Sequence, residues 1–170
     1  MPKIVIAPVR WVDGPELVEV NTRNRPYHSP WVEPFTDIQG FESWFGQRVT
    51  GPHISLVARD ESSRGIVGIL NVNEIVWGVF RSAYVGFYGM AAFSRRGLMT
   101  EALRLTACHA FQEIGLHRLE ANIQPNNLAS IALVQRVGFR REGFSPKYLQ
   151  VGGVWCDHER WALLATGFTG

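Results

Sequence analysis

The sequence predicts a layered α/β domain built on one mixed, mostly antiparallel sheet. Three observations predict this class. Hydrophobic residues make up 46% of the 170-residue chain and charged residues 19%, which is a globular composition. Residues 53–91 hold three strand-like runs separated by short polar turns, as an antiparallel meander requires. From residue 98 the hydrophobic period changes from two to about 3.6, so helices follow the meander.

Length and charge limit the organisation and the partners. A chain of this size can bury one substantial core but is too short for two ordinary domains, so residues 1–170 predict a single domain. A formal net charge of +2 is too small to indicate a nucleic-acid-binding protein. The apolar run at the N-terminus is too short for a signal peptide or a membrane span, so no membrane partner is expected.

The cysteines and histidines indicate neither a disulfide nor a metal site. Cys108 and Cys156 have neither paired spacing nor neighbouring metal-type ligands, and they predict two free thiols in the cytoplasm. The five histidines are scattered without a short metal-binding spacing, so no metal site is expected. The sequence leaves the oligomeric state open, a homodimer included.

The first fifty residues alternate between regular and irregular segments. Residues 3–11 are β-branched and apolar and predict a strand. Asp13 precedes Pro15, and proline favours the first turn of a helix, so a helix begins there. Residues 24–35 carry three prolines and predict a long loop, which in a small domain is usually functional. Residues 36–49 predict a short helix with its apolar side chains on one side.

The remaining elements follow from the same two periods and from turn residues. Gly115 and Gly138 are expected to end helices, because glycine accepts the left-handed cap conformation. A parallel crossover is expected where a strand, a long helix and a strand follow one another. The predicted elements are strands 53–60, 66–78 and 83–91, helix 98–114, strand 116–124, helix 126–137 and the hairpin 139–164.

A basic turn that opens the long helix is the first candidate site. Arg95 and Arg96 stand next to Gly97 directly before the helix. A helix N-terminus exposes unpaired N–H groups and the positive end of the helix dipole, so added arginines concentrate positive charge there. With a glycine turn, these groups form a cradle for a pyrophosphate. An ordinary solvated turn is the alternative.

Several ordered motifs together resemble a known family. They are "SRRGLMTEALRL", "EANIQPNNLAS", "RVGF", and the "YL" and "WCDH" pair of the last hairpin. The chain is similar to the GCN5-related N-acetyltransferases (GNAT), and most similar to their RimJ/RimL-like branch, which acetylates protein N-termini. The resemblance implies the GNAT fold, with a mixed, mostly antiparallel seven-stranded sheet and helices on both faces. It also implies direct transfer from acetyl-CoA to a primary amine in a ternary complex. Alternatives are a small-amine acetyltransferase acting on a polyamine or an aminoglycoside, and a non-catalytic acyl-CoA-binding module.

By this resemblance, three segments bind coenzyme A. The pyrophosphate signature falls on residues 94–99, where the chain keeps the central Gly97 but departs from the pattern at Ser94 and Met99. The strand that ends near Gly89 is expected to part from its neighbour and to offer backbone groups to the pantetheine arm. Ser130 is the candidate acid that protonates the leaving thiolate. Helix capping alone would also explain Asn127 and Ser130, and the two roles are compatible. The implied cofactor-binding residues are Gly89, Met90, Ala91, Ser94, Arg95, Arg96, Gly97, Leu98, Met99, Thr100, Asn127 and Ser130.

The general base is the least determined part of the site. Some relatives carry a glutamate just before the Tyr-Leu pair of the last hairpin, but here Lys147 occupies that place. Glu120 is the first choice, on the same strand face as Asn122, and a simple pairing of Glu120 with an arginine is the alternative. Glu74, which interrupts an apolar strand, is the second choice. The candidate substrate-binding residues are Trp31, Asn122, Tyr148 and His158.

Overall fold

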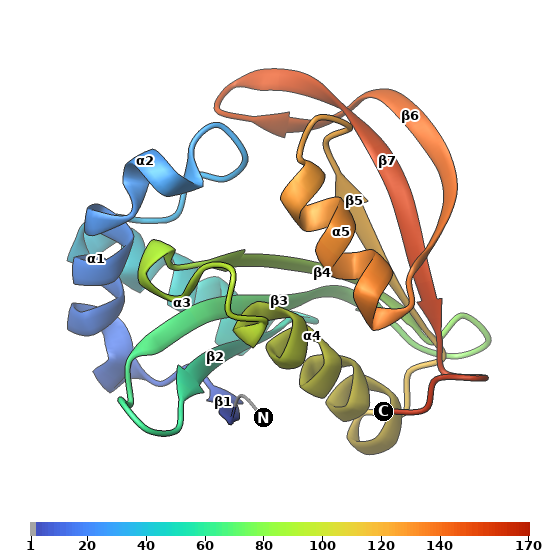
Figure 1. Cartoon of the computed structure of the whole chain (residues 1–170), viewed down its shortest axis with the longest axis horizontal. Coiled ribbons are helices and arrows are strands. Elements are labelled where there is room, and N and C mark those ends of the chain that lie inside the picture. The colour runs from blue at the N-terminus through green and yellow to red at the C-terminus, as the bar shows by residue number, and fades with distance from the viewer. Residues whose placement is uncertain (1–2) are drawn as a thin grey trace.

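The computed structural model describes residues 3–170 and contains one seven-stranded sheet with helices on both faces (Figure 1). None of the helices in this range is long and apolar enough to cross a membrane. The strands are β1 Ile4–Pro8, β2 Ile54–Asp60, β3 Ile66–Val76, β4 Ser82–Gly89, β5 Arg118–Ile123, β6 Arg140–Val151 and β7 Val154–Leu164. The α-helices are α1 Gly14–Arg23, α2 Arg25–His28, α3 Ile38–Thr50, α4 Leu98–Cys108 and α5 Leu128–Val137.

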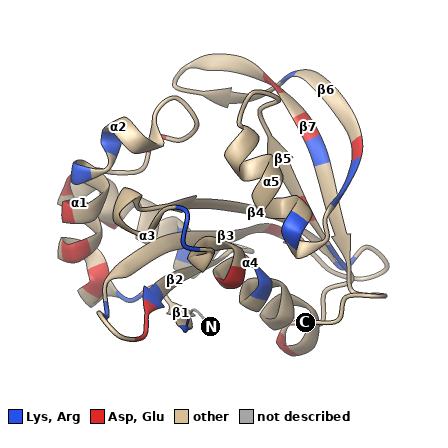
Figure 2. Cartoon of the chain, in the orientation of Figure 1, with Lys and Arg blue, Asp and Glu red and all other residues tan. Residues whose placement is uncertain are grey.

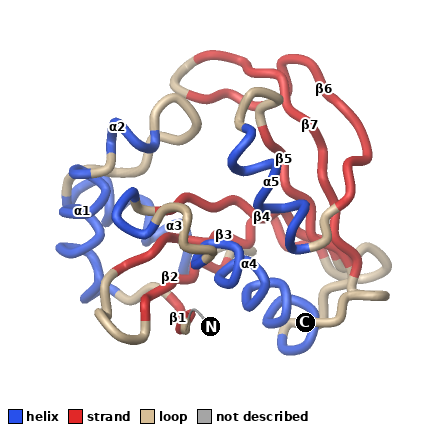
Figure 3. Tube along the Cα trace, viewed as in Figure 1, coloured by secondary structure: helices blue, strands red, loops and turns tan. Residues whose placement is uncertain are grey.

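The sheet divides into two halves at β4 and β5. Its strand order is β1-β2-β3-β4-β5-β7-β6, and neighbouring strands are antiparallel except for β4 and β5. This parallel pair extends over only three residue pairs, from Ser82–Arg118 to Tyr84–Glu120. Beyond Tyr84 the two strands diverge, as the traces in Figure 3 show. The backbone edges of both strands are therefore available to a ligand past that point.

Each face of the sheet packs against its own helices. Leu103 of α4 and Val134 of α5 are fully buried in a cluster that also contains Leu70 of β3. On the other face, Leu17 of α1 and Phe41 of α3 pack with residues of β2 and β3. Full burial of such a side chain contributes about 1.5–3 kcal/mol. Figure 1 shows α4 and α5 in front of the sheet and α3 behind it, which confirms the predicted fold class.

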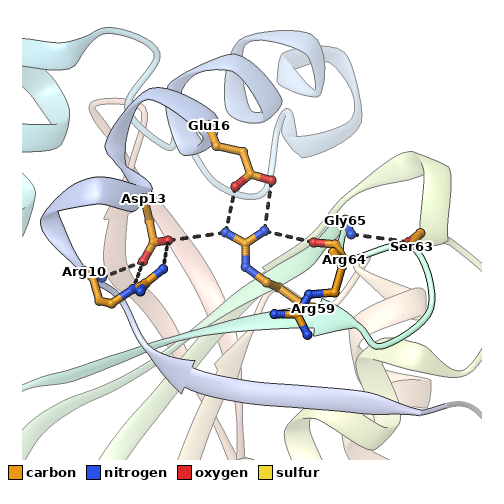
Figure 4. Close-up of polar contacts among 7 residues, drawn as sticks. All are labelled: Arg10, Asp13, Glu16, Arg59, Ser63, Arg64 and Gly65. Carbon is orange, nitrogen blue, oxygen red and sulfur yellow. Dashed lines mark hydrogen bonds and ion pairs between the residues drawn. The ribbon is translucent and has the colours of Figure 1, made fainter.

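The N-terminal end of α1 is joined to β2 by a cluster of charged side chains (Figure 4). The Arg59 guanidinium donates to Glu16 at 2.7 and 2.9 Å, to Asp13 at 3.3 Å and to the carbonyl of Arg64 at 3.0 Å. Burial alone would raise the pKa of Asp13, but hydrogen bonds from Arg10 and the charges of Arg10 and Arg59 lower it below its ordinary value. This cluster fixes α1 against the sheet.

Three element predictions need correction. The loop expected over residues 24–35 contains the short helix α2, because a proline fits its first turn and His28 is buried. The first strand ends at Pro8, and a 3-10 turn over Trp11–Asp13 leads into α1. The long helix keeps its α form only to Cys108 and continues as one π-helical turn over His109–Glu113.

Candidate functional site

A cavity of about 1290 Å³ opens where β4 and β5 part. Its walls come from β4, β5, β7, the turn before α4 and the start of that helix, one side of α5 and the segment around α2. Sites of this kind, at a break in an α/β sheet, are favoured places for ligands. The cavity has one end at the turn before α4 and another at the loop that carries Trp31.

The turn before α4 offers a row of free backbone donors. Within residues 3–170, the N–H groups of residues 95–100 have no hydrogen-bond acceptor, and the first helical bond runs from the N–H of Glu101 to the carbonyl of Gly97 at 3.1 Å. Gly97 caps the helix with φ +74°, a conformation that glycine adopts without strain. Arg95 also has a positive φ, of 58°. Together these amides form the concave donor site expected for a diphosphate.

The charges at this end of the cavity come from two elements. Arg95 in the turn and Arg136 in the last turn of α5 both line the cavity, and Figure 2 shows basic residues at both places. Arg96 does not line it, because its guanidinium stacks on the ring of Phe93, 5.5 Å from the centroid. The sequence prediction missed Arg136, since only the three-dimensional fold brings this residue of α5 to the cavity that the turn before α4 lines.

One acidic residue lines the same end but is neutralised. Glu101 of α4 accepts hydrogen bonds from Arg104 one turn later. These bonds lower the pKa of Glu101 against the opposing effect of burial, so the carboxylate stays charged and paired. The net charge facing the cavity at this end is therefore positive.

Of the backbone groups predicted to face the gap, those of Gly89 do so, but the N–H groups of Met90 and Ala91 do not. The N–H of Met90 donates to Val67 of β3 at 2.9 Å, and the N–H of Ala91 donates to Asn24 at 2.8 Å. Both donors are therefore unavailable to a ligand, and Ala91 does not line the cavity. Backbone groups alternate between the two edges of a strand, so those of Phe87 and Gly89 point away from β3 into the gap.

The first turn of α5 combines a cap with a free hydroxyl. The side-chain oxygen of Asn127 accepts from the backbone N–H of Ser130 at 3.2 Å, so Asn127 is the N-cap. The Ser130 hydroxyl takes no part in this cap and has no hydrogen-bond partner within residues 3–170. Both residues line the cavity. Capping and proton donation thus use different atoms.

The two carboxylates chosen as the base lie outside the cavity. Glu120 lies where β5 is still paired with β4, opposite Tyr84, and it accepts a hydrogen bond from Arg118 at 2.8 Å. Glu74 is exposed at an irregularity of β3, with Oε1 3.8 Å from Nε2 of His53. Glu120 is thus paired with an arginine, as the alternative interpretation expected. Neither Glu120 nor Glu74 lines the cavity.

The candidate acceptor residues are largely brought together. Trp31, Asn122 and His158 line the cavity, and the buried Oδ1 of Asn122 has no hydrogen-bond partner among the described residues. Tyr148 does not line it, but its ring lies 6.4 Å from that of His158. These side chains come from the loop after α2 and from strands β5, β6 and β7.

His28 is a cavity residue that sequence reasoning missed. Its Nε2–H donates to the carbonyl of Gly89 at 2.9 Å, and its ring packs edge-on against Tyr88 at 4.9 Å. Burial is the main effect on this imidazole and lowers the pKa of His28, so the ring stays neutral. Nothing in the proline-rich sequence around His28 predicts its contact with Gly89.

Comparisons with known proteins agree with this arrangement. Residues 3–140 match the family described as "Acetyltransferase (GNAT) domain". The chain is 31% identical over 173 residues to "Probable N-acetyltransferase YjcK" of Bacillus subtilis (strain 168), an alignment that covers 95% of this chain and 93% of that protein. It is 29% identical over 178 residues to the ribosomal protein uS5-alanine N-acetyltransferase of Escherichia coli (strain K12), with coverage of 98% and 90%. The solved structure "Mycobacterium smegmatis RimJ in complex with CoA-disulfide" superimposes with a TM-score of 0.88 at 27% identity, over 98% of this chain and 84% of that chain.

Proposed function

This chain belongs to the GNAT family of acetyltransferases, and on that premise we propose that it acetylates the α-amine at the N-terminus of a protein. The family makes it an N-acetyltransferase that uses acetyl-CoA. The acceptor is our own inference. The observation that carries it is the absence of a free carboxylate among the described residues that line the cavity, combined with the row of free amides at residues 95–100.

The residues present fit coenzyme A at one end of the cavity. The N–H groups of residues 95–100 would hold the diphosphate, with Arg95 and Arg136 on either side of it. The backbone groups of Phe87 and the N–H of Gly89 would hold the amide-bearing pantetheine arm in the gap between β4 and β5. Acetyl-CoA supplies an acetyl group activated as a thioester. Ser130 donates its hydroxyl proton to the departing sulfur.

The acceptor end of the cavity favours a singly charged amine. Of the described residues that line the cavity, Glu101 is the acidic one, and it is paired with Arg104 at the opposite end. A polyamine carries several positive charges and needs carboxylates to replace its hydration. An α-amine has a pKa of about 7.7–8.0 against about 10.4 for a lysine side chain, so its deprotonation at neutral pH costs roughly 3.5 kcal/mol less. The similarity to a ribosomal protein uS5-alanine N-acetyltransferase points in the same direction.

A product analysis tests this proposal directly. The enzyme is incubated with acetyl-CoA and three acceptors: a peptide with a free N-terminus, the same peptide with a blocked N-terminus and an internal lysine, and spermidine. We expect acetylation of the first peptide at its α-amine and less than one tenth of that rate with the other two. Preferential acetylation of spermidine or of the lysine side chain would contradict the proposal.

A further inference from the structure

His158 lines the cavity near the end of β5 that leads into α5. The last pair of β5 and β7 is Ile123–Glu159, so His158 is one residue beyond it, at the end of β5 that leads into the cap of α5. The residue is 4% exposed and lines the cavity together with Ser130. A proton acceptor on β7 and a proton donor on α5 therefore flank the same end of β5.

A backbone contact fixes which ring nitrogen of His158 is basic. Nδ1 lies 2.9 Å from the carbonyl oxygen of Cys156. A carbonyl oxygen can only accept, so Nδ1 carries the hydrogen, and the lone pair of the neutral ring is on Nε2. Within residues 3–170, Nε2 has no hydrogen-bond partner, and it is not among the fully buried unpartnered atoms. Nε2, the basic nitrogen of His158, is therefore not engaged by another group of the described chain.

The other titratable groups near this end are less suited to accept a proton. His28 has its lone pair on Nδ1, which is completely buried, and burial lowers the pKa of this ring. Burial and a hydrogen bond with Tyr148 raise the pKa of Tyr84, so that phenol stays protonated at neutral pH. Glu120 is held by Arg118 outside the cavity.

We propose that His158 is the catalytic base, and this inference rests on the proposed acetylation of an amine. Nε2 takes one proton from the ammonium group of the acceptor. The neutral nitrogen then forms a bond to the thioester carbon, the carbon–sulfur bond breaks, and the sulfur receives the Ser130 proton. Ser130 recovers a proton from the second N–H of the attacking nitrogen, and His158 releases its own proton to water. The products are the amide, the free thiol and one proton.

The surroundings of His158 are mostly neutral. Tyr148 faces it from β6, and Asn122 and Ser130 share the cavity from β5 and α5. Tyr27 lines the cavity from α2, and Arg160 lies two residues after His158 on the same face of β7. No carboxylate among the described residues lines this part of the cavity.

The test compares wild type with His158→Ala at two pH values, using a peptide with a free N-terminus. At pH 6.5, where most of the acceptor is protonated, we expect kcat/KM of the variant to fall by about 100-fold. At pH 9 the α-amine is already neutral, and the variant lacks only the deprotonation step. We therefore expect the ratio of wild-type to variant kcat/KM to be at least tenfold smaller at pH 9 than at pH 6.5. A merely structural role would keep the ratio constant with pH.

Controls separate this inference from the proposed function. His117→Ala, at an exposed position away from the cavity, should match wild type at both pH values. Coenzyme A affinity, measured by calorimetry, should be the same for wild type and His158→Ala. A wild-type enzyme that does not acetylate the peptide contradicts the proposed acceptor, and the same comparison is then run with the amine that it does acetylate. With any acetylated amine, a ratio near one at pH 6.5, or a ratio that does not change with pH, overturns the role of His158.

Discussion

His28 donates its Nε2 hydrogen to the carbonyl oxygen of Gly89 and so ties α2 to the last residue of β4. Gly89 is also approached from the other face, because a Cβ there would lie 2.9 Å from Cγ of Met99. The strand end is therefore held between the segment before the acceptor loop and the start of α4. This arrangement sets which backbone groups of β4 face the gap that coenzyme A would occupy.

His28→Phe keeps a ring of similar shape but removes the hydrogen bond. The Gly89 carbonyl loses its donor, so we expect the free energy of unfolding to fall by about 1–3 kcal/mol and the KM for acetyl-CoA to rise. Denaturant unfolding and steady-state kinetics measure the two effects. His117→Phe makes the same substitution at an exposed position that does not line the cavity, and as the control it should change neither quantity by a comparable amount.

The same residue gives a pH dependence of stability. Burial lowers the pKa of His28 in the folded chain, so the unfolded chain binds a proton more readily. Stability is therefore lost as the pH falls below the unfolded value of about 6.5. Unfolding curves between pH 7.5 and 5 should show this loss in wild type and a shallower slope in His28→Phe. If stability depends on pH equally in the two proteins, His28 has the same pKa in the folded and the unfolded chain.

The cradle before α4 is tested at Gly97. Gly97→Glu should abolish coenzyme A binding, because a carboxylate would face the diphosphate and the left-handed backbone would be strained. Gly167→Glu is a matched control, since Gly167 also has a positive φ and open space around it but does not line the cavity. Calorimetry with coenzyme A should detect normal binding only in the control. Unchanged affinity in Gly97→Glu would rule out this turn as the diphosphate site.

Two arginines near the same turn should differ in effect. Arg136 lines the cavity, whereas Arg96 stacks on Phe93 outside it. We expect Arg136→Ala to weaken coenzyme A binding by about 5- to 10-fold and to reduce its dependence on salt concentration. Arg96→Ala should change the affinity less than twofold. The reverse order would place the phosphates on the other side of the turn.

Ser130→Ala separates catalysis from capping. The Asn127 cap uses the backbone N–H of Ser130, so it survives the substitution. We expect kcat to fall by about 10- to 100-fold while coenzyme A affinity changes little. Stopped-time assays and calorimetry give the two quantities. An equal loss of both would assign the Ser130 hydroxyl to cofactor binding instead.

Much of the fold could be predicted because local patterns determine it. The change of period near Leu98, the glycine at position 138 and the polar turns each act over a few residues. The short helix α2 could not be predicted, since it depends on the burial of His28 against β4, far away in the sequence. Propensity alone indicates a loop wherever prolines are this frequent.

The site was only partly predictable for the same reason. The turn at Gly97 has a local signature, a glycine among basic residues at a helix start. The alternation of β5 placed Glu120 and Asn122 on one face, but it could not show that β4 and β5 separate only after Glu120. Arg136 and His28 reach the cavity through packing between distant segments, which no spacing in the sequence encodes.

Backbone amide shifts recorded by NMR during a titration with coenzyme A examine the cofactor cradle most directly. The largest changes should fall on residues 95–100, with further changes at Phe87 and Gly89 and none at Ala91, whose N–H is already bound to Asn24. If the ligand binds and the signals of residues 95–100 stay in place, the helix entrance does not hold the diphosphate and the assigned cofactor site is wrong.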